Sequence, residues 1–264
     1  MQWCAPVSDS RNLVRAWSPR QRELCSAAMV PSESLRHDHN PRMHQGGKLS
    51  FRSRVQDPDE DPGDRLVLGG KNPPALRELV PADFREVEIE IGPGKGAFVL
   101  AATEAKPDTF LLGIEAAQGY ASLAAARLHL SGRRNGLFLV DNGKLYLQDR
   151  VEDGELAAVH VYFPDPWPKR RHAGRRFFTP DVLPVLARAL RDSGYCYVAT
   201  DNAGYAGQVA RVMGSATDFA RDEEEEARVL ALGAGHAFSP TNFERKYIEQ
   251  GRVIRRYAFR RLPR

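Results

Sequence analysis

Residues 87–96 read VEIEIGPGKG, and this stretch decides the fold. Its first half, 87–91, alternates apolar and acidic side chains with the period of two that a β-strand has. Its second half carries glycines at Gly92, Gly94 and Gly96, as in the turns that lead from a strand into a helix at a nucleoside site. The stretch therefore predicts the first strand, turn and helix of an α/β domain.

Strand-like and helix-like segments alternate along the rest of the chain. Apolar runs without alternation are typical of strands buried on both faces. We therefore expect an α/β fold with an open, mostly parallel, doubly wound sheet. The last apolar segment, 253–261, is too short for another crossover unit and is expected to pair antiparallel at the sheet edge. The other expected helices are 96–105, 118–130 and 180–191, and the other expected strands are 109–114, 137–140, 157–163 and 195–199.

Residues 1–62 show no sustained periodicity and end in a run rich in proline and aspartate. This predicts a poorly ordered extension, or a true start at Met29 or Met43, ahead of one domain over residues 63–264. The extension contains no continuous apolar core of a secretory signal, and the chain has no run of roughly 18 apolar residues that would span a bilayer.

The three cysteines lie far apart, without metal-ligand spacing. They predict free thiols, a reducing cytoplasmic compartment and no metal site. The formal net charge is +4, but basic residues cluster at 169–176 and 252–264 while acidic residues gather at 222–226. Charge divided in this way predicts a polyanionic partner on one face.

Two carboxylates accompany the glycine turn. Glu115 closes the second strand, where an acidic side chain can accept hydrogen bonds from ribose hydroxyls. The turn also satisfies the looser dinucleotide pattern, so NAD remains an alternative from these residues, as does a structural turn without a ligand. Glu90 favours S-adenosylmethionine, because a carboxylate at the end of the first strand would repel a pyrophosphate but attract a cation.

The sequence HVYFPDPWPK over residues 160–169 follows the fourth expected strand. Strand ends of this kind line the ligand crevice of an open α/β sheet, so Asp165 is expected to face the reactive end of the cofactor. Its flanking prolines restrict the backbone, and Trp167 offers a surface for stacking a base. The basic run that follows is expected to bind the phosphates of a nucleic acid. The alternative is a stiff loop whose charges are solvated and bind no partner.

These motifs together resemble the bacterial tRNA (guanine-N7)-methyltransferase family. The resemblance covers residues 84–261 and includes the glycine turn, Glu115, the block 163–167, the strand end 199–201 and the segment 241–245. It implies a Rossmann-like class I methyltransferase fold with S-adenosylmethionine as donor. It further implies tRNA as the partner, with guanine 46 of the variable loop as the acceptor.

The resemblance also implies a role for individual residues. Asp165 would be the catalytic carboxylate and would contact the donor as well. Other donor contacts would come from Glu90, Gly92, Gly94, Gly96, Glu115 and Asn142, with Asp141 one position away as an alternative to Asn142. Lys169, Asp201, Thr241, Asn242, Phe243 and Glu244 would hold the substrate, and Arg171, His172, Arg175 and Arg176 would contact RNA.

Some alternatives remain open from the sequence. Asp201 follows a strand, where an aspartate is often a helix cap. Asn202 stands where the family often has tryptophan, which puts the outer tRNA contacts in question. An amino-group methyltransferase of adenine or protein and a non-catalytic RNA-binding protein are the competing functions. A monomer or weak homodimer is expected.

Overall fold

An eight-stranded sheet with the strand order β1-β4-β3-β2-β5-β6-β8-β7 forms the centre of the protein. The computed structural model describes residues 62–167, 169–238 and 242–263. The strands from β1 to β6 pair in parallel, and β8 runs antiparallel to both β6 and β7. The strands are β1 (Leu66–Leu68), β2 (Glu86–Ile91), β3 (Thr109–Glu115), β4 (Gly136–Val140), β5 (Leu156–Tyr162), β6 (Leu190–Thr200), β7 (Phe219–Arg221) and β8 (Arg255–Arg261).

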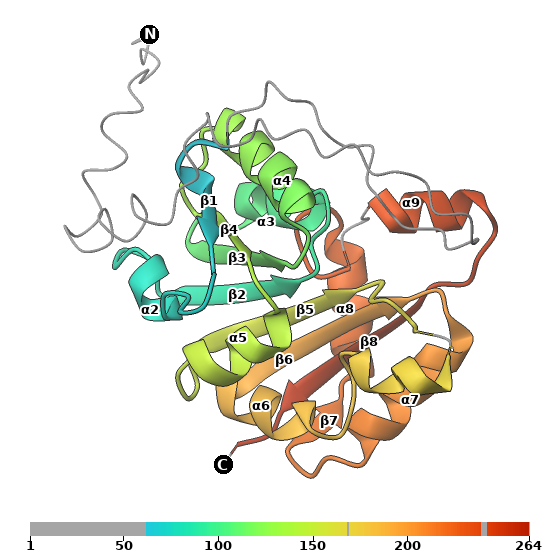
Figure 1. Cartoon of the computed structure of the whole chain (residues 1–264). Coiled ribbons are helices and arrows are strands. Elements are labelled where there is room, and N and C mark those ends of the chain that lie inside the picture. The colour runs from blue at the N-terminus through green and yellow to red at the C-terminus, as the bar shows by residue number, and fades with distance from the viewer. Residues whose placement is uncertain (1–61, 168, 239–241, 264) are drawn as a thin grey trace, which may run out of the picture.

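Helices cover both faces of this sheet (Figure 1). Residues of α2, α5, α6 and α7 pack with one face into one apolar core, and residues of α3, α4 and α8 pack with the other face into a second core. This is the doubly wound arrangement that the sequence predicted. The helices are α2 (Leu76–Leu79), α3 (Ala97–Ala105), α4 (Gln118–Leu130), α5 (Gly143–Arg150), α6 (Val182–Ala189), α7 (Ala203–Gly214), α8 (Glu223–Leu232) and α9 (Asn242–Glu249).

Two expected boundaries differ in the structure. The helix expected over 180–191 is α6, which ends at Ala189 and passes directly into the long strand β6. The antiparallel strand at this end of the sheet is confirmed, but β8 lies one position in from the edge because β7 covers it. β7 has only three residues, Phe219–Arg221, too few for a periodic pattern to show in the sequence.

The alternation in β2 has an unusual outcome. Val87 and Ile89 enter one core, as expected, but Glu88 and Glu90 are only 8% and 2% exposed. A strand of this pattern normally turns its charged side chains to water. Here β2 pairs with β3 and β5 and helices cover both faces, so each glutamate needs a partner within the protein.

Residues 1–61, most of the expected extension, lie outside the described residues, so its order and its start stay predictions. Within the described ranges, no helix is long and apolar enough to span a membrane. Cys196 is buried in the middle of β6 as a free thiol.

Candidate active site

The carboxyl ends of five neighbouring parallel strands bring most of the expected site residues to one edge of the sheet. From β2 the chain continues to β3 and β4 on one side, and then returns to β5 and β6 on the other side. The reversal lies between β2 and β5, and open α/β sheets bind ligands in the crevice outside such a point. The glycine turn follows β2, and Asp165 follows β5, so these two elements flank the reversal.

The glycine turn depends on backbone conformations that favour glycine. Gly92, Gly94 and Gly96 have φ angles of 71°, 55° and 73°. A Cβ atom at Gly96 would lie 2.8 Å from the side chains of Ala124 and Phe138, so this position also requires the absence of a side chain. The chain therefore turns into α3, as the sequence predicted, and does so close to α4 and β4.

Glu115 joins the glycine turn to the end of β3. Its two carboxylate oxygens accept hydrogen bonds from the backbone N–H groups of Gly94, at 3.0 Å, and Ala117, at 2.9 Å. A carboxylate has about four acceptor positions, so two remain for ligand hydroxyls. The protein thus fixes the orientation of Glu115 before any ligand binds.

Glu90 is the buried carboxylate at the end of β2. Its Oε2 atom has no hydrogen-bond partner among the described residues. Burial and the charge of Glu115 raise the pKa of Glu90 to about 8, although a hydrogen bond from the backbone of Val99 opposes the shift. A buried carboxylate with an unused oxygen suits a cationic ligand, so the residues present fit S-adenosylmethionine better than a pyrophosphate.

The end of β4 holds the two alternatives for the third donor contact. The side-chain oxygen of Asn142 caps α5 and accepts from the N–H groups of Lys144, at 3.1 Å, and Leu145, at 3.3 Å. The Oδ1 atom of Asp141 accepts from the Asn142 backbone at 2.6 Å, and its Oδ2 is buried without a partner among the described residues. Because capping uses its oxygen, Asn142 can offer a ligand only its amide N–H groups.

The loop that carries Asp165 is held at both ends. Phe163 and Trp167 have positive φ angles of 50° and 39°, which are rare and costly outside glycine. The backbone N–H of Phe163 bonds the Ala199 carbonyl on β6 at 2.7 Å. Between these residues the Asp165 side chain is exposed. Backbone strain of this kind persists only where the surrounding structure enforces it, and it often accompanies function.

Arg176 holds much of this strained loop in place. Its guanidinium donates to the carbonyl oxygens of Pro166, at 2.8 Å, and Trp167, at 2.9 Å, and also bonds the side chain of Gln208 on α7. Sequence reasoning assigned Arg176 to RNA and did not find this role or Gln208. A run of basic residues does not reveal which member turns inward.

Three other members of the basic run are exposed to solvent. Arg171 and Arg175 are exposed, as is Lys169. Arg175 lies over the Trp167 ring at 5.1 Å, and the His172 ring meets the edge of the same tryptophan at 5.7 Å. The Arg175 cation and the His172 ring therefore both contact the aromatic ring that follows Asp165 in the loop.

On the substrate side, acidic residues are paired with arginines from the C-terminal part of the chain. Asp201 forms a 2.6 Å ion pair with Arg252, which also lies 4.5 Å from the centre of the Tyr247 ring. Glu244 on α9 is 1% exposed and pairs with Arg256 of β8. The cap of α7 is Asn202, whose side chain accepts from the Tyr205 N–H at 2.9 Å, so the helix-cap alternative for Asp201 is wrong.

The remaining expected substrate residues are only partly described. Thr241 lies outside the described residues. Asn242 and Phe243 begin α9, but only their backbone is described. Arg252 and Tyr247 were not found from the sequence, because no motif marks a pair that forms through tertiary contact.

A surface depression of about 590 Å³ lies away from this site, beside the end of α3 and the segment between α4 and β4. Its charged side chains pair with one another, Arg133 with Glu104 at 2.6 Å and Arg134 with Asp83 at 2.7 Å. Asp108, which also lines it, is exposed, and a single exposed carboxylate does not point to a ligand. Within the described part of the chain, no group of three or more His, Cys, Asp or Glu residues could hold a metal ion.

Comparison with known proteins agrees with this geometry. Residues 85–257 match the model of a family described as putative methyltransferases. The tRNA (guanine-N(7)-)-methyltransferase of Bordetella pertussis is 33% identical over 232 residues, which cover 81% of this chain and 89% of that protein. The chain belongs to the tRNA (guanine-N7)-methyltransferase family.

Other relatives bear the same name. The Streptomyces coelicolor protein is 33% identical over 214 residues, covering 75% of this chain and 71% of its own length. The Rhodopirellula baltica protein is 43% identical over 129 residues, covering 45% of this chain and 46% of that protein, so the chain spans about half the length of this relative. These matches confirm the family that the sequence motifs resemble.

A solved structure supports the fold alone. The 16S rRNA methyltransferase KamB superposes with a TM-score of 0.50 at 16% identity, covering 75% of this chain and 99% of that one. The expected class I methyltransferase fold is therefore confirmed.

Proposed function

We propose that this chain transfers the methyl group of S-adenosylmethionine to N7 of guanine 46 in the variable loop of tRNA. One observation carries the proposal. The glycine turn with its two carboxylates, Glu90 and Glu115, lies across the β2–β5 reversal from the strained loop of Asp165, in a chain of the tRNA (guanine-N7)-methyltransferase family.

Donor binding follows from the carboxylates. Glu115 is oriented by the Gly94 and Ala117 N–H groups and would accept from the ribose hydroxyls. Glu90 would face the cationic part of the donor, where its unused oxygen gains a partner. When bound there, S-adenosylmethionine supplies an electrophilic methyl group.

The acceptor needs little chemical activation. Guanine N7 has a lone pair in its neutral form, so no proton has to be removed before attack, and in-line positioning supplies most of the rate. The guanine ring becomes cationic as the methyl group arrives. The fixed charge of Asp165 would stabilise that developing charge, and its carboxylate can also accept from the N1 and amino groups of the base.

The substrate groups complete the arrangement. Trp167, with Arg175 over its ring, offers a surface for the target base or a neighbouring one. Lys169 and Arg171 are exposed beside this surface, where the phosphates of the variable loop would lie. Asp201 and the 241–244 segment would hold the acceptor from the other side. We also infer a cytoplasmic site of action, in the compartment of mature tRNA, by a monomer or weak homodimer.

Mass spectrometry of tRNA nucleosides tests the proposal. The protein is incubated with unmodified tRNA and methyl-labelled S-adenosylmethionine, and the tRNA is digested to nucleosides. We expect labelled 7-methylguanosine from tRNA with guanine 46 and none from tRNA in which this base is adenine. Label on an adenine amino group or on protein would favour an amino-group methyltransferase. Binding of tRNA without transfer would favour an RNA-binding protein.

A further inference from the structure

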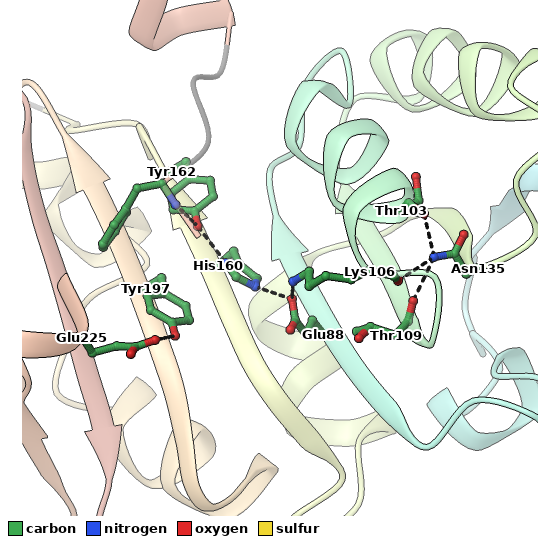
Figure 2. A network of polar contacts seen from close by, with 10 residues as sticks. Glu88, Thr103, Lys106, Thr109, Asn135, His160, Tyr162, Tyr197 and Glu225 are labelled. Carbon is green, nitrogen blue, oxygen red and sulfur yellow. Dashed lines mark hydrogen bonds and ion pairs between the residues drawn. The ribbon is translucent and has the colours of Figure 1, made fainter. Parts of the chain in front are cut away.

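A series of polar contacts, drawn in Figure 2 from Lys106 to Tyr162, crosses the sheet. It ends at the backbone of Phe238. Glu88 on β2 bonds Lys106 at the end of α3 and, at 3.0 Å, the Nε2 atom of His160 on β5. The Nδ1 atom of His160 lies 2.7 Å from the Tyr162 hydroxyl, which accepts the backbone N–H of Phe238 at 3.1 Å. The site described above uses none of these side chains.

The charge states fix the donor and the acceptor of each hydrogen bond in this series. Burial opposes ionisation of Glu88, but the hydrogen bond from His160 and the charge and hydrogen bond of Lys106 outweigh it and lower the pKa of Glu88. Burial lowers the pKa of His160 more than Glu88 raises it, so we assign the neutral ring. A neutral ring donates from Nε2 to the carboxylate and accepts the Tyr162 O–H at Nδ1. Tyr162 then has its oxygen free to accept from Phe238.

Aromatic rings surround the middle of this series of hydrogen bonds. The His160 ring stacks on Tyr197 at 5.2 Å and lies 4.4 Å from Phe98. The Phe238 ring packs against Tyr197 at 5.6 Å and Tyr162 at 6.3 Å. Phe238 is therefore held twice, through its backbone N–H by Tyr162 and through its ring by the same cluster.

Phe238 needs to be held because its backbone is strained. Its φ angle is 61°, in the left-handed region that a bulky side chain rarely adopts. It directly precedes the segment 239–241, after which α9 begins at Asn242. The contact between Tyr162 and Phe238 thus lies where the chain enters the segment expected to bind the substrate.

The need of the buried Glu88 carboxylate for hydrogen-bond partners does not explain the whole series of contacts. Lys106 and His160 already give Glu88 an ion pair and a hydrogen bond. Tyr162 and the Phe238 N–H extend the chain away from the charge, toward α9. Hydrogen bonds in such a series polarise and orient one another, so a fixed charge at one end restricts the geometry at the other.

We propose that Lys106, Glu88, His160 and Tyr162 form a relay that positions Phe238, and with it the start of α9 at Asn242, for binding of the acceptor tRNA. The inference rests on the proposed function. The four side chains act as positioning residues: they touch neither donor nor acceptor, and they determine how well the acceptor is bound rather than whether the donor is.

Replacing Tyr162 by phenylalanine tests the relay, because it removes one oxygen and keeps the ring contacts. The Phe238 N–H then loses its acceptor, and the cost of a buried unpaired donor corresponds to roughly a tenfold change in an equilibrium. We expect Tyr162→Phe to raise the KM for tRNA by about that factor, with the Kd for S-adenosylmethionine unchanged. Hydrogen exchange of the Phe238 amide should become faster.

Tyr197→Phe is the matched control. Tyr197 belongs to the same aromatic cluster, but its hydroxyl bonds Glu225 at 2.6 Å and takes no part in the relay. We expect this variant to lose stability without a rise in the KM for tRNA. If both variants change that KM equally, or if the Phe238 amide exchanges at the wild-type rate in Tyr162→Phe, the relay only stabilises the fold. Wild-type protein that leaves tRNA unmethylated would instead overturn the proposed function, and the relay's role with it.

Discussion

The two halves of the candidate site are built in different ways. In the donor half, at the ends of β2 and β3, left-handed glycines shape the turn and backbone N–H groups orient Glu115. In the acceptor half, after β5 and β6, long side chains hold one another: Asp201 pairs with Arg252, and Arg176 fixes the loop of Asp165. There three residues other than glycine, Phe163, Trp167 and Phe238, also have positive φ.

This difference distinguishes the half of the site that does not depend on the acceptor from the half that does. A donor half made of backbone and two carboxylates needs only local sequence, and it can serve any acceptor. An acceptor half made of tertiary pairs can be retuned one side chain at a time. We therefore expect mutations in the two halves to affect different constants, and the predictions below run from the largest expected effect to the smallest.

The largest effect is expected at the boundary of the two halves. Asp165→Ala should lower turnover by about a hundredfold or more, because the charge that stabilises the cationic guanine is lost. Donor affinity should remain near that of the wild type. Single-turnover methylation of tRNA and calorimetry with S-adenosylmethionine measure the two quantities. Asp165→Asn keeps the shape without the charge, and near-normal turnover of either variant would contradict the catalytic assignment.

Glu115→Ala should act on the donor half alone. Loss of charge-assisted bonds to the ribose hydroxyls should weaken donor binding by about 1.5–3 kcal/mol. Calorimetry tests this directly. Glu104→Ala serves as the control, since Glu104 pairs with Arg133 on the surface, away from the glycine turn. A donor dissociation constant that is the same in both variants would rule out the ribose contact.

Glu90 should make donor binding depend on pH. Its pKa of about 8 in the folded protein means that the carboxyl is protonated at neutral pH, and a bound cation would favour its ionisation. Donor affinity should therefore rise with pH up to about 8, by at most about tenfold per unit. Calorimetry in buffers of different ionisation enthalpy should detect proton release, which Glu90→Gln should abolish. Equal proton release from wild type and Glu90→Gln would contradict the assignment.

The same carboxyl should affect folding in the opposite direction. The folded protein keeps the proton up to about pH 8, whereas the unfolded chain loses it near 4.5. The contribution of Glu90 to the free energy of unfolding therefore falls as pH rises through this window. Glu90→Gln should remove that loss, which thermal unfolding at several pH values would measure.

The smallest effect is expected for the exposed arginines. Replacing Arg171 and Arg175 together by alanine should reduce the slope of log tRNA affinity against log salt by roughly 0.7–0.9 for each lost phosphate contact. The matched pair is Arg133 and Arg134, at the other side of the molecule, whose replacement should leave the slope unchanged. Parallel lines for wild type and the Arg171 and Arg175 variant would exclude phosphate binding. Arg176 is kept apart, because its loss should also loosen the Asp165 loop.

The fold was largely predictable because its signals are local. The alternation in β2, the glycine turn and the apolar run of β3 each identify an element without knowledge of its neighbours. The position of β8 was missed by one strand, since the short β7 has no signal of its own. The positions of Glu90 and Glu115 beside the glycine turn were predictable for the same local reason, and their contact with the donor stays a prediction. The roles of Arg176 and Arg252 were not found, because they depend on tertiary contacts: Arg176 folds back onto the loop before it, and Arg252 pairs with a residue far away in the sequence.

The place of β8 also has a kinetic consequence. Among the described strands β7 pairs with β8 alone, although β8 comes later in the chain, so β7 can join the sheet only together with β8 or after it. Until then the outer edge of β6 stays open, and an open strand edge is a template for pairing with other molecules. Addition of β8 therefore closes the aggregation-prone stage of folding, and the yield of refolding should fall with protein concentration while that stage lasts.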